Sequence, residues 1–244
     1  MSAPTVVGLD CGRIRTQRRT LVADAGTDVV ELPVPAWLVR HPDGIVVFDV
    51  GLHRDLAVDS SSLGRLAALF EIDLTTDGTV GPRLESHDVD PGGALTVVLS
   101  HCHFDHVGGL VDVPNARVVV QRDEWHAARA GEGAYDAGLV DHGHEVVELD
   151  GPHDLFGDGS VTCVPTPGHT CGHQSLRVVT AGGPTILASD ACYFAHTLDD
   201  GALPPFAHDH DRQRESLELL RRERAAGTTI VPGHDADVFA AWRG

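Results

Sequence analysis

The chain contains no lysine, and its 18 arginines are outnumbered by 36 aspartates and glutamates. The formal net charge of −18 argues against nucleic acid or an anionic membrane as partner, because a phosphate-binding protein needs a basic surface. No apolar run approaches the length of a transmembrane helix. The first residues, MSAPTVVGLDCGRIRTQ, lack the apolar stretch of a secretory signal, so we expect a cytoplasmic protein.

Cysteine is also scarce. The five cysteines are odd in number and form no disulfide spacing, which suits reduced thiols. The composition, 42% hydrophobic and 22% charged, is that of a globular protein. A chain of 244 residues can build a core without covalent cross-links, and no linker or repeat divides it. We therefore expect one domain over residues 1–244.

Short apolar runs between glycine- and proline-rich turns predict strands at residues 37–40, 45–50, 96–100, 117–121, 161–164, 174–180, 185–188 and 228–231. Helices are predicted at residues 63–70, 123–130 and 211–226. Many strands with a few helices between them indicate an α/β fold in which two packed sheets are flanked by helices. The least regular stretch, residues 53–93, is expected to be a lid or a substrate-facing insertion.

The segment HCHFDH at residues 101–106 carries three imidazoles and a carboxylate directly after a predicted buried strand. Such a density of polar groups would be unfavourable there unless a metal ion compensated it. Extended backbone through His103 would place His101 and His103 on one face and Cys102 on the other. Gly108 and Gly109 allow the chain to turn, so that Asp105 and His106 can reach a second ion.

Three further candidate ligands follow predicted strands: His169 in TPGHTCGH, Asp190 in ASDAC and His234 in VPGHD. A carboxylate such as Asp190 can bridge two ions with its two oxygens. Together the seven residues predict a pair of divalent ions that share a hydroxide, which is the centre of a hydrolase. His173 is expected to lie beside the ligands, and the remaining histidines are expected to be surface or structural residues: His41, His53, His87, His126, His142, His144, His153, His196, His208 and His210.

The segments SHCHFDHVGG, TPGHTCGHQSL, SDACY and PGHD resemble the metallo-β-lactamase superfamily of hydrolases. Within it the chain most resembles the N-acyl homoserine lactonases, in LPVPAWLVRHPDGIVVFDVG, in DLFGDGSVTCVPTPGHTCGHQSL, and in Tyr193 where those enzymes carry a catalytic tyrosine. Cys102 and Cys171 depart from the usual pattern. The resemblance implies a four-layer αββα sandwich. It also implies the ligand assignment: His101, His103 and His169 for one metal, Asp105, His106 and His234 for the other, and Asp190 between them.

The resemblance further implies that a metal-bridging hydroxide opens the lactone ring of N-acyl homoserine lactones. Tyr193 would donate a hydrogen bond to the carbonyl or the developing alkoxide, and Asp105 would pass a proton to the leaving alcohol. Zinc is the expected metal, with iron, manganese or cobalt as alternatives. A small neutral lactone suits the acidic chain, residues 56–90 are expected to contribute to its acyl-chain pocket, and a homodimer is left open.

Other functions fit parts of this pattern. A lactonase for a pyridoxal-derived or secondary-metabolite lactone would use the same ligands. A glyoxalase II-type thioesterase also remains an alternative, although only ten residues follow His234 and few basic groups could hold glutathione. True β-lactamases of the superfamily often have a cysteine where Asp190 stands, and its diiron members commonly have a glutamate where His103 stands. The sequence therefore favours neither of these two classes. A protein that only binds zinc for structure is not favoured either, because such a site needs four ligands and no open position, whereas this chain offers seven candidate ligands and Tyr193.

Overall fold

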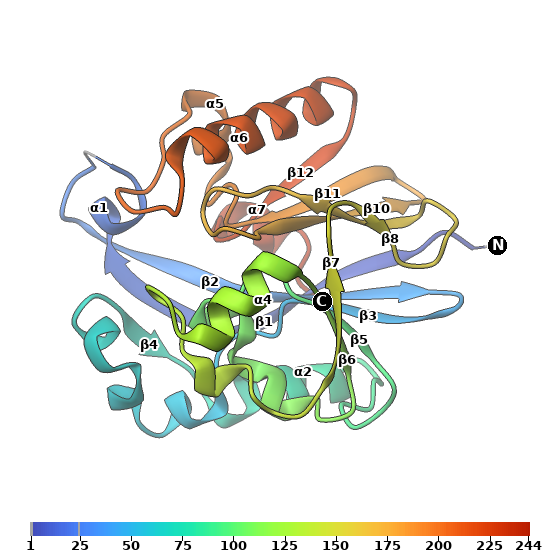
Figure 1. Ribbon diagram of the computed structural model, residues 1–244, viewed down its shortest axis with the longest axis horizontal. Helices are drawn as coiled ribbons and strands as arrows, with labels where there is room; N and C mark the ends of the chain where they lie inside the picture. Colours follow the sequence, from blue (N-terminus) through green and yellow to red (C-terminus); the bar gives the residue numbers. More distant parts are fainter. Residues whose placement is uncertain (1, 24) are drawn as a thin grey trace.

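Two β-sheets packed face to face form the centre of the protein, whose computed structural model describes residues 2–23 and 25–244 (Figure 1). The larger sheet has the strand order β4-β1-β2-β3-β5-β6-β7 and the smaller one the order β12-β11-β10-β9-β8. The strands of the larger sheet are β1 (Thr5–Gln17), β2 (Val29–His41), β3 (Gly44–Phe48), β4 (Glu71–Asp73), β5 (Thr96–Val98), β6 (Arg117–Gln121) and β7 (Glu145–Leu149). Those of the smaller sheet are β8 (His153–Asp154), β9 (Val161–Pro165), β10 (Gln174–Thr180), β11 (Gly183–Ser189) and β12 (Thr229–Pro232).

Helices cover the outer faces of both sheets. In Figure 1, α5 and α6 lie beyond the smaller sheet, and α2 and α4 lie on the side of the larger one. The α-helices are α1 (Arg18–Leu21), α2 (Val80–Glu85), α3 (Phe104–Val107), α4 (Arg122–Ala130), α5 (Ala195–Asp200), α6 (His210–Ala225) and α7 (Ala236–Ala240). Short 3₁₀ helices are η1 (Arg54–Ala57), η2 (Ser60–Ala68), η3 (Thr76–Gly78), η4 (Gly108–Asp112) and η5 (Ala137–Leu139).

The alternation of side chains along the buried strands produces the layers. Successive residues of a strand point to opposite faces, so Val46 and Phe48 join the core between the two sheets while Val47 joins the core beneath α2 and α4. In the smaller sheet, Leu187 faces the other sheet and Ile186 packs with residues of α6. Both faces of each sheet are therefore buried, and the expected four-layer αββα sandwich is confirmed.

Strand direction brings one edge of each sheet to the same place. β3, β5, β6 and β7 run parallel to one another, and β11 runs parallel to β12. The carboxyl ends of parallel strands lie at one edge of a sheet, which is where ligands collect in such folds. The chain leaves β3, β5, β11 and β12 at these edges, just before Asp49, His101, Asp190 and His234.

Most predicted strands are confirmed, with shifts of a few residues at their ends. The helices predicted at residues 123–130 and 211–226 are confirmed as α4 and α6. The structure adds β1, β4, β7 and β8, and it lengthens the predicted strand at 37–40 into the 13-residue β2. β1 escaped prediction because Asp10, Arg13 and Arg15 interrupt its apolar pattern.

The α-helix predicted at residues 63–70 is wrong. This stretch forms the 3₁₀ element η2, which breaks at Gly64 (φ 57°) and contains no buried residue. Leu66 lines a cavity and Leu63 packs only partly buried against the core, so the stretch lacks the buried face that stabilises an amphipathic helix. Over residues 53–93 the chain forms η1, η2, β4, η3 and α2.

None of the helices within residues 2–23 and 25–244 has the length and apolar character that a membrane crossing requires.

Candidate metal centre

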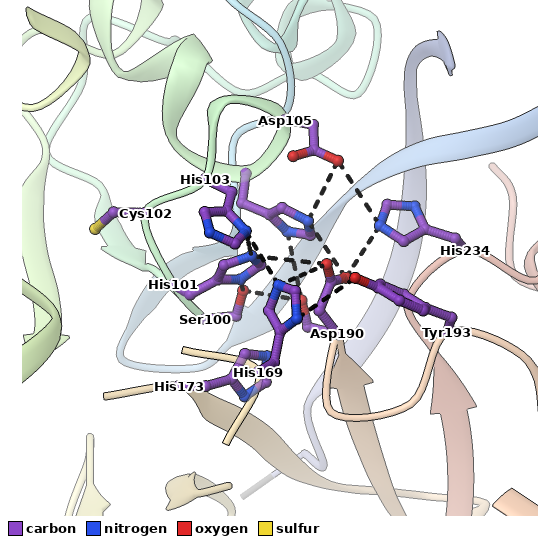
Figure 2. Close-up of polar contacts among 12 residues, drawn as sticks. Ser100, His101, Cys102, His103, Asp105, His169, His173, Asp190, Tyr193 and His234 are labelled. Carbon is purple, nitrogen blue, oxygen red and sulfur yellow. Dashed lines mark hydrogen bonds and ion pairs between the residues drawn. The ribbon is translucent and has the colours of Figure 1, made fainter. Parts of the chain in front are cut away.

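The structure brings all seven predicted ligands together in two adjoining clusters (Figure 2). In the first cluster, His101, His103, His169 and Asp190 each offer a ligand atom, and these atoms lie within 4.8 Å of one another. His103 Nδ1 lies 3.1 Å from His101 Nε2 and 3.0 Å from His169 Nε2. Three imidazole nitrogens thus converge on one point.

The second cluster consists of Asp105, His106 and His234, whose ligand atoms also lie within 4.8 Å of one another. Asp190 connects the two clusters because its oxygens point in different directions. Its Oδ2 lies 3.3 Å from His169 Nε2, and its Oδ1 lies 3.0 Å from His234 Nε2 and 3.4 Å from His106 Nε2. This arrangement allows one carboxylate to serve two ions.

The ligands come from strand ends and loops, although one local detail differs from the sequence prediction. β5 ends at Val98, and His103 is the N-terminal cap of α3, so the backbone is not a continuous strand through His103. The expected division of side chains still holds, since Cys102 points away from the two histidines beside it (Figure 2). Asp105 and His106 lie on the single turn of α3.

Hydrogen bonds at the outer ring nitrogen fix the orientation of most of these histidines. When one nitrogen is held in this way, the other is directed at the centre in its ligating tautomer. The pairs are His101 Nδ1 with Ser100 Oγ (2.9 Å), His106 Nδ1 with Asp49 Oδ2 (2.9 Å), His234 Nδ1 with the carbonyl of Pro33 (2.8 Å) and His169 Nδ1 with the hydroxyl of Tyr193 (3.4 Å).

The polar atoms at the centre fit metal ions. Among the residues that the structure describes, His106 Nε2 and Asp190 Oδ1 are buried and have no partner in hydrogen-bonding geometry, although Oδ1 lies 3.0 Å from His234 Nε2. Buried polar atoms without partners are unfavourable, and an ion placed among them would satisfy both. Imidazole nitrogens with carboxylate oxygens suit zinc and also iron, manganese or cobalt.

Electrostatics keep His101, His169 and Asp190 in the protonation states that ligation needs, whereas Asp190 and Asp105 outweigh burial and raise the pKa of His106 and of His234, which must therefore lose a proton to bind an ion. Burial lowers the pKa of His101 and of His169 well below the ordinary value, so both imidazoles are neutral. Burial alone would raise the pKa of Asp190, but the neighbouring His106 and His234 outweigh it and hold that pKa well below its usual range. Neutral imidazoles and an ionised carboxylate are the forms that bind divalent ions.

Sequence reasoning missed Asp49, which lies just after β3. Asp49 is buried, and besides His106 it accepts hydrogen bonds from the backbone N–H (2.7 Å) and the hydroxyl (2.8 Å) of Ser100 and from the hydroxyl of Ser189 (3.2 Å). A carboxylate directly after the apolar run Val46–Val47–Phe48 was the available signal. Glu124, a fully buried carboxylate at the start of α4, was also missed.

Residues of α6 support the backbone of Asp190 and of the loop that leads to His169. The side-chain amide of Gln213 donates to the carbonyl of Asp190 (3.3 Å), and the hydroxyl of Ser216 donates to the carbonyl of Pro167 (2.7 Å). Gly168, with φ of 132°, lies so close to α6 that a Cβ atom would meet the Gln213 nitrogen at 2.2 Å. Only glycine allows this approach, which sets the position of His169.

Tyr193 lies beside the centre and is buried. Its ring is 5.7 Å from those of His169 and His234. Burial, and then the charges of Asp190 and Asp105, raise the pKa of its phenol well above the ordinary value. The hydroxyl therefore remains protonated and can donate a hydrogen bond.

A cavity of about 570 Å³ opens onto the centre. Its wall includes His103, Asp105, His169, Asp190, Tyr193 and His234. Most of the remaining lining is apolar and comes from distant parts of the chain: Ile14, Leu21, Leu32, Leu66, Leu69, Phe70, Phe104 and Phe206. The volume is typical of a small-molecule site.

Comparison with known proteins agrees with this geometry. The family described as the metallo-beta-lactamase superfamily matches residues 29–234. An N-acyl homoserine lactonase, AttM of Rhizobium radiobacter, is 32% identical over 225 residues, which cover 87% of this chain and 86% of that protein. A probable metallo-hydrolase of Mycobacterium tuberculosis, Rv2300c, is 28% identical over 83% of this chain and 74% of its own.

The fold also matches a solved structure. An N-acyl homoserine lactone hydrolase, with the product N-hexanoyl-L-homoserine at its catalytic metal centre, superposes with a TM-score of 0.90 at 23% identity, covering 100% of this chain and 98% of that one. The ligand motifs, the four layers and these matches lead to the same conclusion. The protein belongs to the metallo-β-lactamase superfamily, and it is a metal-dependent hydrolase related to the N-acyl homoserine lactonases.

Proposed function

We propose that this protein opens the lactone ring of N-acyl homoserine lactones. The observation that carries the proposal is the position of Asp190, which faces both ligand clusters and, with Tyr193, the apolar cavity. A hydrolytic centre at the end of an apolar cavity suits a neutral substrate with an acyl chain. Relatives at about 30% identity that carry the lactonase name support this substrate class.

In this proposal His101, His103 and His169 hold one divalent ion, and Asp105, His106 and His234 hold the other. Asp190 contacts both. When bound, the two ions, with zinc as the first expectation, would supply a hydroxide at neutral pH and a positive charge that polarises the lactone carbonyl. Iron, manganese and cobalt are compatible with the same donor atoms.

The chain's own residues have separate tasks in ring opening. Tyr193, whose phenol stays protonated, donates a hydrogen bond to the substrate carbonyl oxygen as negative charge develops on it. Asp105 lies on the cavity wall, and its carboxylate would accept the proton of the attacking hydroxide oxygen and pass it to the alkoxide that leaves when the ring C–O bond breaks. The product is an acyl homoserine with a free carboxylate and a free hydroxyl.

The apolar wall accommodates the acyl chain. Leu66, Leu69 and Phe70 belong to residues 53–93, so we propose that this segment is the substrate-facing part of a single metallo-hydrolase domain spanning residues 1–244. Leu69 and Phe206 remain about half exposed although they line the cavity. Covering them with an acyl chain would remove apolar surface from water, which favours binding.

Proton release over a panel of substrates tests the proposal. The panel contains short and long acyl homoserine lactones, γ- and δ-lactones, a thioester and a β-lactam. Asp190→Asn is expected to abolish turnover, and Asp237→Asn, which changes an exposed carboxylate outside the cavity, is expected to retain it. Turnover of the acyl homoserine lactones supports the assignment. Activity confined to another lactone or to the thioester would contradict the proposed substrate and still support a hydrolytic centre.

A further inference from the structure

We propose that Glu124 is a positioning residue that holds together the two loops carrying His101, His103 and His169. The inference rests on the metal assignment proposed above for these three histidines. It assigns a role to a buried carboxylate that is not itself directed at the ligand cluster.

Glu124 lies in the first turn of α4 and is fully buried. Its Oε1 accepts a hydrogen bond from the backbone N–H of Cys102 (2.9 Å), and its Oε2 accepts one from the backbone N–H of Gly172 (3.0 Å). A buried carboxylate is unfavourable unless hydrogen bonds compensate it, so both contacts are needed to keep it there. One side chain thus joins two segments about 70 residues apart in sequence.

Both contacts are made within a few residues of the ligands. Cys102 lies between His101 and His103, and its side chain points away from the cluster. Gly172 lies three residues after His169, and a Cβ atom on it would meet the Glu124 nitrogen at 2.5 Å. Because Gly172 has no Cβ atom, the His169 loop can approach α4 closely enough for Glu124 to contact it.

His103 is the ligand that most needs such support. In the part of the chain that the structure describes, no hydrogen bond reaches its Nε2, in contrast to the outer nitrogens of the other four ligand histidines. Its ring instead lies 5.4 Å from that of Tyr135. Glu124 therefore supports His103 through the backbone of Cys102.

The contacts require a carboxylate and not merely a polar side chain of that size. Glutamate presents an acceptor oxygen to each of the two N–H groups, whereas glutamine has one oxygen and one NH₂ group. Glu124→Gln therefore keeps the volume but sets a donor against one backbone donor. We expect the two loops to separate slightly, so that the three imidazole nitrogens no longer converge on one point.

Release of metal to a competing chelator tests the inference without using the hydrolytic reaction. Zinc-loaded Glu124→Gln is expected to give up the ion of the first cluster at about 10- to 100-fold lower chelator concentration than the wild type, as is usual when an outer support of a ligand is lost. The ion of the second cluster should be released as in the wild type. The absorption spectrum of the cobalt-loaded protein should change as well, because it reports the geometry around the ion.

Asp123→Asn is the matched control. It removes one negative charge from the exposed neighbouring residue in the same helical turn, so it is expected to leave release and spectrum unchanged. Glu124→Asp is a second variant that keeps the buried charge but is one methylene too short to reach both N–H groups, and the same selective loss is expected from it.

The inference is overturned if both Glu124 variants retain wild-type release and spectrum, or if Asp123→Asn weakens binding as much as they do. The latter result would mean that charge alone is responsible. A wild-type protein that binds no metal would overturn the proposed function together with this inference. A wild-type protein that binds metal, beside Glu124 variants that behave like it, would overturn this inference alone.

Discussion

Asp49 Oδ2 lies 2.9 Å from His106 Nδ1, although 57 residues separate them in the sequence. The same carboxylate binds the backbone and hydroxyl of Ser100, which precedes His101. Asp49 has φ of 57°, a left-handed conformation that aspartate and asparagine tolerate better than most residues. It therefore sets the orientation of His106 and fixes it relative to the end of β5.

Asp49→Asn is expected to weaken the ion of the second cluster by about 10- to 100-fold, because the amide replaces one acceptor oxygen with a donor. Chelator competition measures the change. Asp88→Asn is the control, since Asp88 is exposed and also has φ of 57°. Equal metal release from the two variants would show that Asp49 does not support His106.

Tyr193→Phe is expected to lower kcat for lactone opening on the order of 100-fold, the usual loss when one donor to a developing oxyanion is removed. At saturating metal the variant should still be fully loaded, because the phenol is not a proposed ligand, although loss of its contact with His169 Nδ1 (3.4 Å) should lower the metal affinity. Stopped-flow proton release and metal analysis of the same sample provide both measurements. A variant that retains full turnover with full metal content would exclude the proposed role of Tyr193.

Gly168→Ala and Gly183→Ala separate backbone strain from the close contact with α6. Both glycines have positive φ, 132° and 111°, so each alanine is expected to be destabilising on the order of 1–2 kcal/mol. Only at Gly168 would the new Cβ also meet α6, since nothing lies within 4 Å of that position on Gly183. Urea unfolding should show the larger loss for Gly168→Ala, and similar losses would contradict the contact.

His173 makes stability depend on pH. Burial lowers its pKa from 6.5 to about 3, so below pH 6.5 the unfolded chain binds a proton there that the folded chain does not. The native state therefore loses stability as the pH falls from 6.5 towards 3. Between pH 7 and pH 5, the free energy of unfolding of the metal-free wild type should fall by about 2 kcal/mol more than that of His173→Gln. Urea unfolding at the two pH values measures this difference, and parallel falls would show that His173 does not contribute.

The ligand motifs were readable because each is local. The segment from His101 to His106 places four candidate ligands within six residues, and the Pro-Gly turns before His169 and His234 mark loops that follow strands. The sequence predicted β6 and β10 at their observed limits: β6 has a run of three buried valines, and β10 is rich in β-branched residues and ends at a glycine turn. Prediction failed for η2, which contains no buried residue, and for β1, whose charged residues interrupt the pattern.

The sequence by itself therefore indicated the candidate ligands, their order along the chain and the superfamily to which the chain belongs. Only the tertiary structure decided that Asp49 supports His106, that Glu124 joins two ligand loops, and that Leu66, Phe104 and Phe206 share one cavity. These contacts join residues tens to more than a hundred positions apart. No local pattern encodes them, because they arise when the parallel strands of the two sheets end side by side and bring distant loops into contact.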